Sequence, residues 1–164
     1  MAWSKGGTTT LGVAAGTIDV SLTTAKKFMV ILESRLDQST LNNDYIRVGN
    51  STIDTGSNYA YRYSTNGGAD GTGVSNSIMV HGFFATNSPK FMVNYMVNIG
   101  TEEKLLISFA IDQSSSGSGS APLRNESVGK WSNTSNQIDI WQSRSDNGIK
   151  TYAADSNTTI IGSD

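Results

Sequence analysis

The sequence predicts an all-β protein, an antiparallel β-sandwich resembling a jelly roll. Three observations predict this fold. Short stretches of alternating apolar and polar residues recur along the chain, turn-forming stretches rich in Gly, Asn and Ser separate them, and no convincing helical pattern lies between them. About ten such stretches in one domain suit a jelly roll better than an immunoglobulin-like sandwich.

The first two predicted strands span 17–22 and 26–36. In the first, Ile18, Val20 and Leu22 share a face because strand side chains alternate. The second also fits a helix by spacing, but period two in every neighbouring segment favours a strand. Its two faces carry Phe28, Val30, Leu32 and Leu36 on one side and Met29, Ile31, Glu33 and Arg35 on the other.

The same alternation continues through the rest of the chain. Segment 59–64 places Tyr59, Tyr61 and Tyr63 on one face, and segment 103–112 alternates residues such as Leu105 and Leu106. The remaining predicted strands span 45–48, 77–84, 91–99, 126–131, 137–143 and 158–162.

Residues that favour turns lie between these segments. We predict connectors at 49–58 and 64–73, and a tight turn at Asn147-Gly148. Pro89 and Pro122 also lie in connectors, where a missing backbone donor is harmless.

A run of serine and glycine at 114–120 poses the question of domain number. Strands of the same kind flank it, and the piece that follows is too short to fold alone without disulfides or metal. We therefore predict one β-sandwich domain over 13–164, with a long Ser/Gly loop at 113–122. Residues 1–12 are polar and are predicted to form an N-terminal arm.

Composition excludes several classes of function. The net charge is −2 and only 16% of residues are charged, without the basic face that a nucleic-acid partner requires. No apolar run approaches the length of a membrane span, and the chain has no cysteine. The first residues lack the apolar stretch of a secretory signal, so we expect synthesis in the cytoplasm.

Three places could carry chemistry, and each has a simpler interpretation. His81 is the only histidine and is predicted to be a packed residue at a strand end. Glu102 and Glu103 are adjacent, so a strand would point them to opposite faces. Asp70 lies among glycines but without the ligand spacing of a calcium loop. We expect no catalytic residue, cofactor or metal site.

Aromatic residues are the candidate contact residues. Their rings could stack on sugar or on a second subunit, or they could pack inside the protein. Trp3, on the polar arm, could anchor that arm on a neighbouring subunit. The candidates are Trp3, Tyr59, Tyr61, Tyr63, Trp131 and Trp141.

Several longer stretches resemble small virion structural proteins of tailed phages, especially marine and environmental ones. They are LGVAAGTIDV, IRVGNSTIDTGSNYAYRYSTNGGADGT, IGTEEKLLISFAID, SAPLRNESVGKWSNTSNQI and ADSNTTIIGSD. The resemblance covers most of the chain and implies a β-sandwich virion component without enzymatic activity.

The expected function is therefore structural. We expect a capsid decoration or cement protein, located in the virion and made in the host cytoplasm. Its partners would be other virion proteins, such as the major capsid protein or a fibre base, and copies of itself, for example in a trimer. The alternative is a receptor- or glycan-binding head of a tail fibre or spike. A glycan hydrolase would require two carboxylates that meet in space.

Overall fold

The computed structural model describes residues 2–36, 42–84, 88–145 and 150–164. Within them the chain forms thirteen strands and no helix, arranged as two antiparallel sheets. The predicted all-β antiparallel sandwich is confirmed, with more strands than the ten or so expected from the sequence. The predicted turn at Asn147-Gly148 lies outside the described residues.

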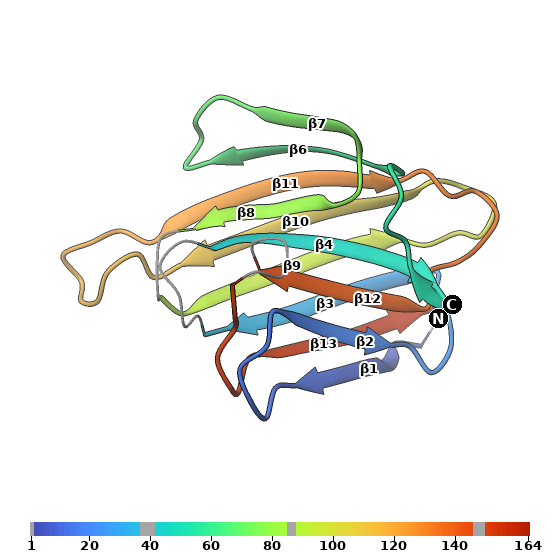
Figure 1. Cartoon of the computed structure of the whole chain (residues 1–164), viewed down its shortest axis with the longest axis horizontal. Helices are drawn as coiled ribbons and strands as arrows, with labels where there is room; N and C mark the ends of the chain where they lie inside the picture. The colour runs from blue at the N-terminus through green and yellow to red at the C-terminus, as the bar shows by residue number, and fades with distance from the viewer. Residues whose placement is uncertain (1, 37–41, 85–87, 146–149) are drawn as a thin grey trace.

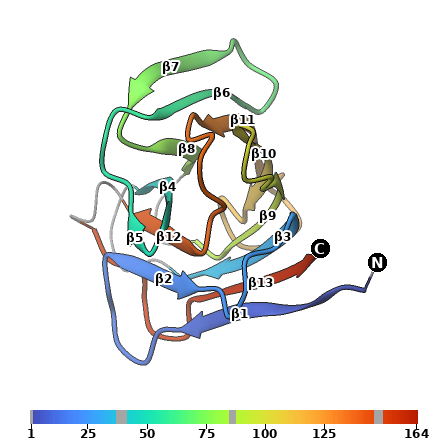
Figure 2. The ribbon, with the colours of Figure 1, turned by 90° about the vertical axis from the view of Figure 1, so that its right-hand side faces the viewer.

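The larger sheet has eight strands and curves around the smaller one (Figures 1 and 2). In spatial order its strands are β1 (Ser4–Thr10), β13 (Asn157–Ser163), β3 (Phe28–Arg35), β9 (Lys90–Val97), β10 (Lys104–Asp112), β11 (Leu123–Trp131), β6 (Tyr59–Thr65) and β7 (Gly71–Asn76).

The smaller sheet has five strands and packs on one face of the larger. Its order is β2 (Thr17–Ser21), β12 (Ile140–Ser145), β4 (Asn42–Asn50) and β5 (Thr52–Ile53), while β8 (Met79–Phe84) pairs with the other end of β4.

The N-terminal segment differs from the prediction. Residues 4–10, expected to belong to a polar arm, form edge strand β1 and pair with β13. Thr8, Thr9 and Thr10 are β-branched and favour extended backbone, and pairing with β13 provides partners for the backbone groups on one side of this segment. Most residues of this strand are exposed, so its composition is polar and did not indicate a strand.

Two predicted connectors also contain strands. β5 lies within 49–58, and β7 begins within 64–73. In β7, Gly73 pairs with Tyr61 and Gly71 with Tyr63, and each tyrosine ring occupies the space that a side chain on the glycine would need. Glycine is therefore needed at these two positions of β7, because the tyrosine rings lie directly against its backbone.

The Ser/Gly run connects two central strands of the larger sheet. β10 and β11 pair without interruption from Lys104 opposite Trp131 to Asp112 opposite Leu123. The run is thus the loop of a long hairpin, and it projects beyond one end of the sandwich (Figure 1).

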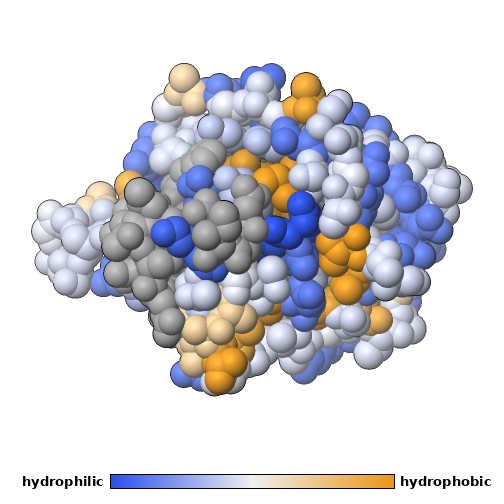
Figure 3. All heavy atoms as spheres, in the orientation of Figure 1, coloured by the Kyte–Doolittle hydropathy of each residue, from blue (hydrophilic) through white to orange (hydrophobic). Residues whose placement is uncertain are grey.

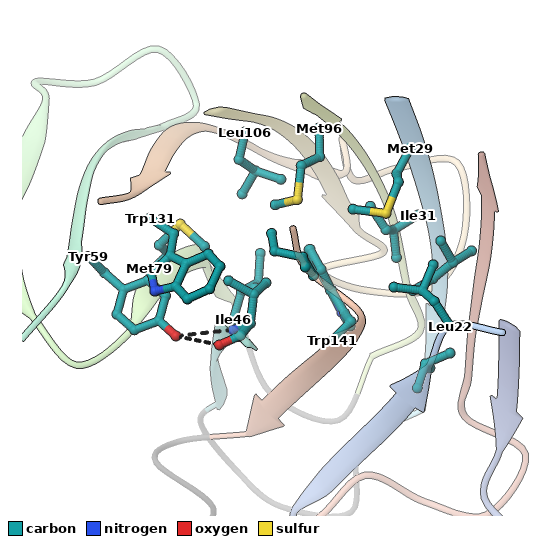
Figure 4. Packing of buried hydrophobic residues seen from close by; sticks show 14 residues of the cluster. Leu22, Met29, Ile31, Ile46, Tyr59, Met79, Met96, Leu106, Trp131 and Trp141 are labelled. Atoms are coloured by element: carbon teal, nitrogen blue, oxygen red, sulfur yellow. Dashed lines mark hydrogen bonds between the residues drawn. The ribbon is translucent and has the colours of Figure 1, made fainter. Parts of the chain in front are cut away.

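The apolar core occupies one half of the space between the sheets. Met29, Met96 and Leu106 of the larger sheet point toward Trp141 and Ile46 of the smaller one (Figure 4). Burying these side chains is the main force that holds the two layers together.

Candidate functional site

The two faces of the larger sheet have unusual compositions, and β10 shows the pattern most clearly. Its residues are alternately buried and exposed along the strand. The buried side carries Lys104, Leu106, Ser108, Ala110 and Asp112, whereas the exposed side carries Leu105, Ile107, Phe109 and Ile111. The face turned away from the smaller sheet is therefore the more apolar of the two.

The same pattern extends across β3 and β9, and β11 adds Val128 at the border of this surface, between the outward-facing charged residues Glu126 and Lys130. Strand register places Tyr95 beside Ile107, with Val30 and Val128 on either side in the same row. We call this surface the outer apolar face. Its most exposed members are Phe28, Phe91, Tyr95, Leu105, Ile107, Phe109, Ile111 and Val128. On the side of the molecule that carries the smaller sheet, hydrophilic and apolar residues are mixed (Figure 3).

A broad hollow of about 770 Å³ lies on the outer apolar face. Phe28, Tyr95, Leu105 and Ile107 line it, together with Trp3. The Trp3 side chain is about half exposed, at 53%. The structure thus places Trp3, a predicted contact residue, beside the outer apolar face. Single exposed apolar residues are common, but a continuous apolar face marks a binding surface.

Three predicted contact residues lie in the core instead. Tyr59, Trp131 and Trp141 are at most 2% exposed. The Tyr59 hydroxyl donates to the Val48 carbonyl oxygen at 2.8 Å, and the Trp131 indole N–H donates to Asp54 Oδ2 at 2.7 Å. This corrects the surface-contact interpretation in favour of the packing one, because their polar atoms already have partners inside the protein.

Tyr61 and Tyr63 occupy an intermediate position. Both are half buried, and their ring centroids lie 6.3 Å apart at a tilt. The glycines of β7 lie against the rings. Tyr61 packs against the apolar core, so much of its ring surface is taken up within the fold.

A buried polar cluster fills the other half of the space between the sheets. At its centre is Glu33, whose Oε1 accepts hydrogen bonds from Arg35 Nη2 at 2.6 Å and Trp141 Nε1 at 3.1 Å. Ser143 and Thr158 hydroxyls also donate to Oε1. These residues come from both sheets, so the cluster joins the two layers.

The second carboxylate oxygen of Glu33 faces His81 and Asn94. His81 Nδ1 lies 3.2 Å from Glu33 Oε2, and Asn94 Nδ2 donates to it at 3.4 Å. Burial lowers the pKa of His81 to about 4, although Glu33 acts in the opposite direction. Burial would raise the pKa of Glu33, but Arg35, His81 and the hydrogen bonds hold it below its ordinary value.

The cluster continues toward Asp44 and Tyr152. The Tyr152 hydroxyl donates to Asp44 Oδ1 at 2.5 Å, and Lys90 Nζ lies 3.6 Å from Asp44 Oδ2. The Arg35 guanidinium lies 5.0 Å from the centre of the Tyr152 ring. Burial, together with the nearby Asp44 carboxylate, raises the pKa of Tyr152 well above its ordinary value. Opposite charges therefore lie next to each other in this part of the interior.

This arrangement is suited to fixing the fold. Glu33 and His81 are each only 1% exposed, so a substrate cannot reach them in this conformation. His81 is buried against Glu33, as predicted for a packed residue, but it lies within β8 and not at a strand end. Sequence reasoning missed the cluster itself. The sequence feature that indicates this cluster is the strand face formed by Met29, Ile31, Glu33 and Arg35. On this face two charged residues follow two apolar ones.

The other candidates for chemistry have protein partners. Glu103 Oε2 accepts from Lys130 Nζ at 2.7 Å. Asp70 Oδ2 accepts from Arg62 Nη1 at 2.9 Å. No group of three or more potential metal-ligating His, Cys, Asp or Glu residues occurs among the described residues.

The sequence was compared with protein-family models and with curated proteins. The chain matches no protein-family model, and no curated protein matches its sequence. In the described part of the chain, no helix has the length and apolar character to cross a membrane.

Proposed function

We propose that the protein is a non-enzymatic structural component of a phage particle that acts by association with other proteins, most simply as a capsid decoration or cement protein. The outer apolar face is the observation that carries this proposal. An apolar sheet face that stays in water is costly, and a second protein surface that covers it recovers the free energy of burial.

The remaining surface suits a repetitive assembly. The net charge of −2 limits electrostatic repulsion between neighbouring copies. β1 and β7 are the edge strands of the larger sheet, each with a strand partner in that sheet on one side only, and docking on other virion proteins would cover these edges. The Ser/Gly loop projects from one end, where it can reach a neighbour.

Copy number on purified particles tests this proposal. A decoration protein should be present in a number comparable with that of the major capsid protein, measured by quantitative mass spectrometry. Dissociation by heat or salt before the shell opens would support attachment to the outside of the lattice. Absence of the chain from purified particles would contradict the proposal.

A second candidate is the receptor- or glycan-binding head of a fibre or spike. A polar hollow of about 350 Å³ at one end of the sandwich favours it, with Asn50, Thr52, Asp54 and Asn136 among its lining residues. Amide, hydroxyl and carboxylate groups of this kind suit sugar hydroxyls. Binding of host polysaccharide by the purified protein, lost in Asn136→Ala, together with a copy number fitting a fibre tip, would favour this candidate.

A further inference from the structure

We propose that the outer apolar face binds the same face of a second copy of this chain, so that two larger sheets stack in a two-fold symmetric dimer. This inference rests on the proposed function by association and names the partner of its main surface. Three properties of the face point to a second copy: its area, its charge and its position in the sheet.

The area matches that of a stable dimer. The most exposed members of the face have between 37% and 54% of their surface accessible. An aromatic side chain can bury roughly 150–250 Å² and the aliphatic members are smaller, so at about half exposure the eight residues expose on the order of 600–800 Å² together. A standard protein–protein interface buries about 800 Å² on each partner. One copy of the face can therefore cover another without help from other surfaces.

The charges around the face are balanced. At the rim formed by β11, Lys130 pairs with Glu103 at 2.7 Å and Arg124 pairs with Glu126 at 3.2 Å. A strongly acidic or basic partner would gain little from such a rim. Two identical faces can meet without like-charge repulsion, which is the condition for a two-fold contact.

The face lies in the middle of the sheet. Its four strands, β3, β9, β10 and β11, have β13 and β1 on one side and β6 and β7 on the other. Ile107 and Tyr95 are direct cross-strand neighbours near its centre. Two sheets stacked in the usual way place their inner faces about 10 Å apart with the strands nearly aligned. A two-fold axis near Ile107 then brings the two Ile107 side chains close together.

The first test measures the mass of the purified protein in solution by analytical ultracentrifugation. We expect a dimer for the natural sequence. Ile107→Glu should raise the dissociation constant by roughly 100-fold or more, because two carboxylates would enter the apolar interface. Val13→Glu is the matched control, since Val13 is exposed in the segment between β1 and β2, away from the face. It should remain dimeric, and the unfolding midpoint of each variant shows whether it has folded.

The second test uses the absence of cysteine from the chain. In Ile107→Cys the only thiol lies near the proposed two-fold axis, so mild oxidation should give a covalent dimer. Val13→Cys, treated in the same way, should stay largely unlinked. This pair keeps the proposal testable if Ile107→Glu does not fold.

Three results would overturn the dimer. They are a monomeric natural protein at tens of micromolar, an oligomer that Ile107→Glu leaves intact, and equal cross-linking of both cysteine variants. A monomer that is abundant on particles would leave the proposed function standing, with the face assigned to a different virion protein. A dimer that is absent from particles would reject the proposed function alone.

Discussion

The inner and outer faces of the larger sheet are built from the same strands, yet they reverse the usual distribution of polarity. Across half of the inner face, Glu33, Arg35, Asn94 and Asp112 are buried. On the outer face, residues such as Phe109 remain about half exposed. Alternation decides which side chains share a face. The second layer decides which of the two faces is covered.

The difference also shows how a polar interior can be stable. Removing a charge from water costs several kcal/mol unless a partner and hydrogen bonds compensate. Glu33 has both, because donors from β3, β12 and β13 converge on one of its oxygens. The outer face needs no such network, because its stabilisation would come from burial against another protein. The following experiments measure the contrast.

The largest effect is expected at the centre of the buried polar cluster. Glu33→Met should lower the free energy of unfolding by about 3–5 kcal/mol, because Arg35 would keep a buried charge without its carboxylate. Urea unfolding at pH 7 measures this. The double replacement Glu33→Met with Arg35→Met should recover part of the loss. A single variant within about 1 kcal/mol of the natural protein would show that the cluster contributes little.

Neighbouring residues of β10 give the most direct contrast between the faces. Leu106 is buried and Ile107 is exposed, although they are adjacent in one strand. Leu106→Ala should cost about 2–5 kcal/mol through lost burial and a cavity. Ile107→Ala, in a sample dilute enough to be monomeric, should cost less than about 1 kcal/mol. Similar losses in both variants would mean that the outer face is packed within the monomer.

Acid should weaken the inner face selectively. The pKa of His81 is about 4 in the folded protein, whereas an unfolded histidine titrates near its ordinary value of 6.5. Between these two pH values the unfolded chain binds more protons than the folded protein. The contribution of His81 to the free energy of unfolding is therefore fully present above about pH 6.5. It is lost as the pH falls toward 4, which lowers the free energy of unfolding by about 3 kcal/mol. Unfolding curves across this range measure the slope. In His81→Phe the slope should flatten, and an unchanged slope would assign it to other groups.

The smallest effect is expected for an ion pair on the outer side. Lys130 and Glu103 are 2.7 Å apart, nearly as close as Arg35 and Glu33 at 2.6 Å, but both are substantially exposed. Lys130→Met should change the free energy of unfolding by less than about 1 kcal/mol, because water screens an exposed pair. High salt should reduce even this difference. A loss as large as that of Glu33→Met would contradict the role assigned to burial.

Period two predicted most of the fold because it is a local property. The alternation of Leu105 and Leu106, or of Met29 and Val30, requires no knowledge of distant residues. β1 and β7 were missed for the opposite reason. Their threonines and glycines become strands only when β13 and the tyrosines of β6 lie alongside them.

The sites were less accessible to prediction. The sequence singled out aromatic residues for contacts, but Trp131 and Trp141 fill the core, while the outer apolar face combines aliphatic residues such as Ile107 with other aromatic residues such as Phe109. Glu33 and His81 are far apart in sequence and come from different sheets. Their contact depends on how the layers superimpose, which alternation alone does not specify.

The position of β13 has a consequence for how the protein folds during synthesis. This strand, from the end of the sequence, lies between β1 and β3, from its beginning. Until residues 157–163 have emerged from the ribosome, β1 lacks its partner in the larger sheet and one side of β3 is open. Completion of the larger sheet must therefore wait for β13, as expected for a topology dominated by distant pairings, and the nascent chain carries an unprotected strand edge beside apolar residues until then.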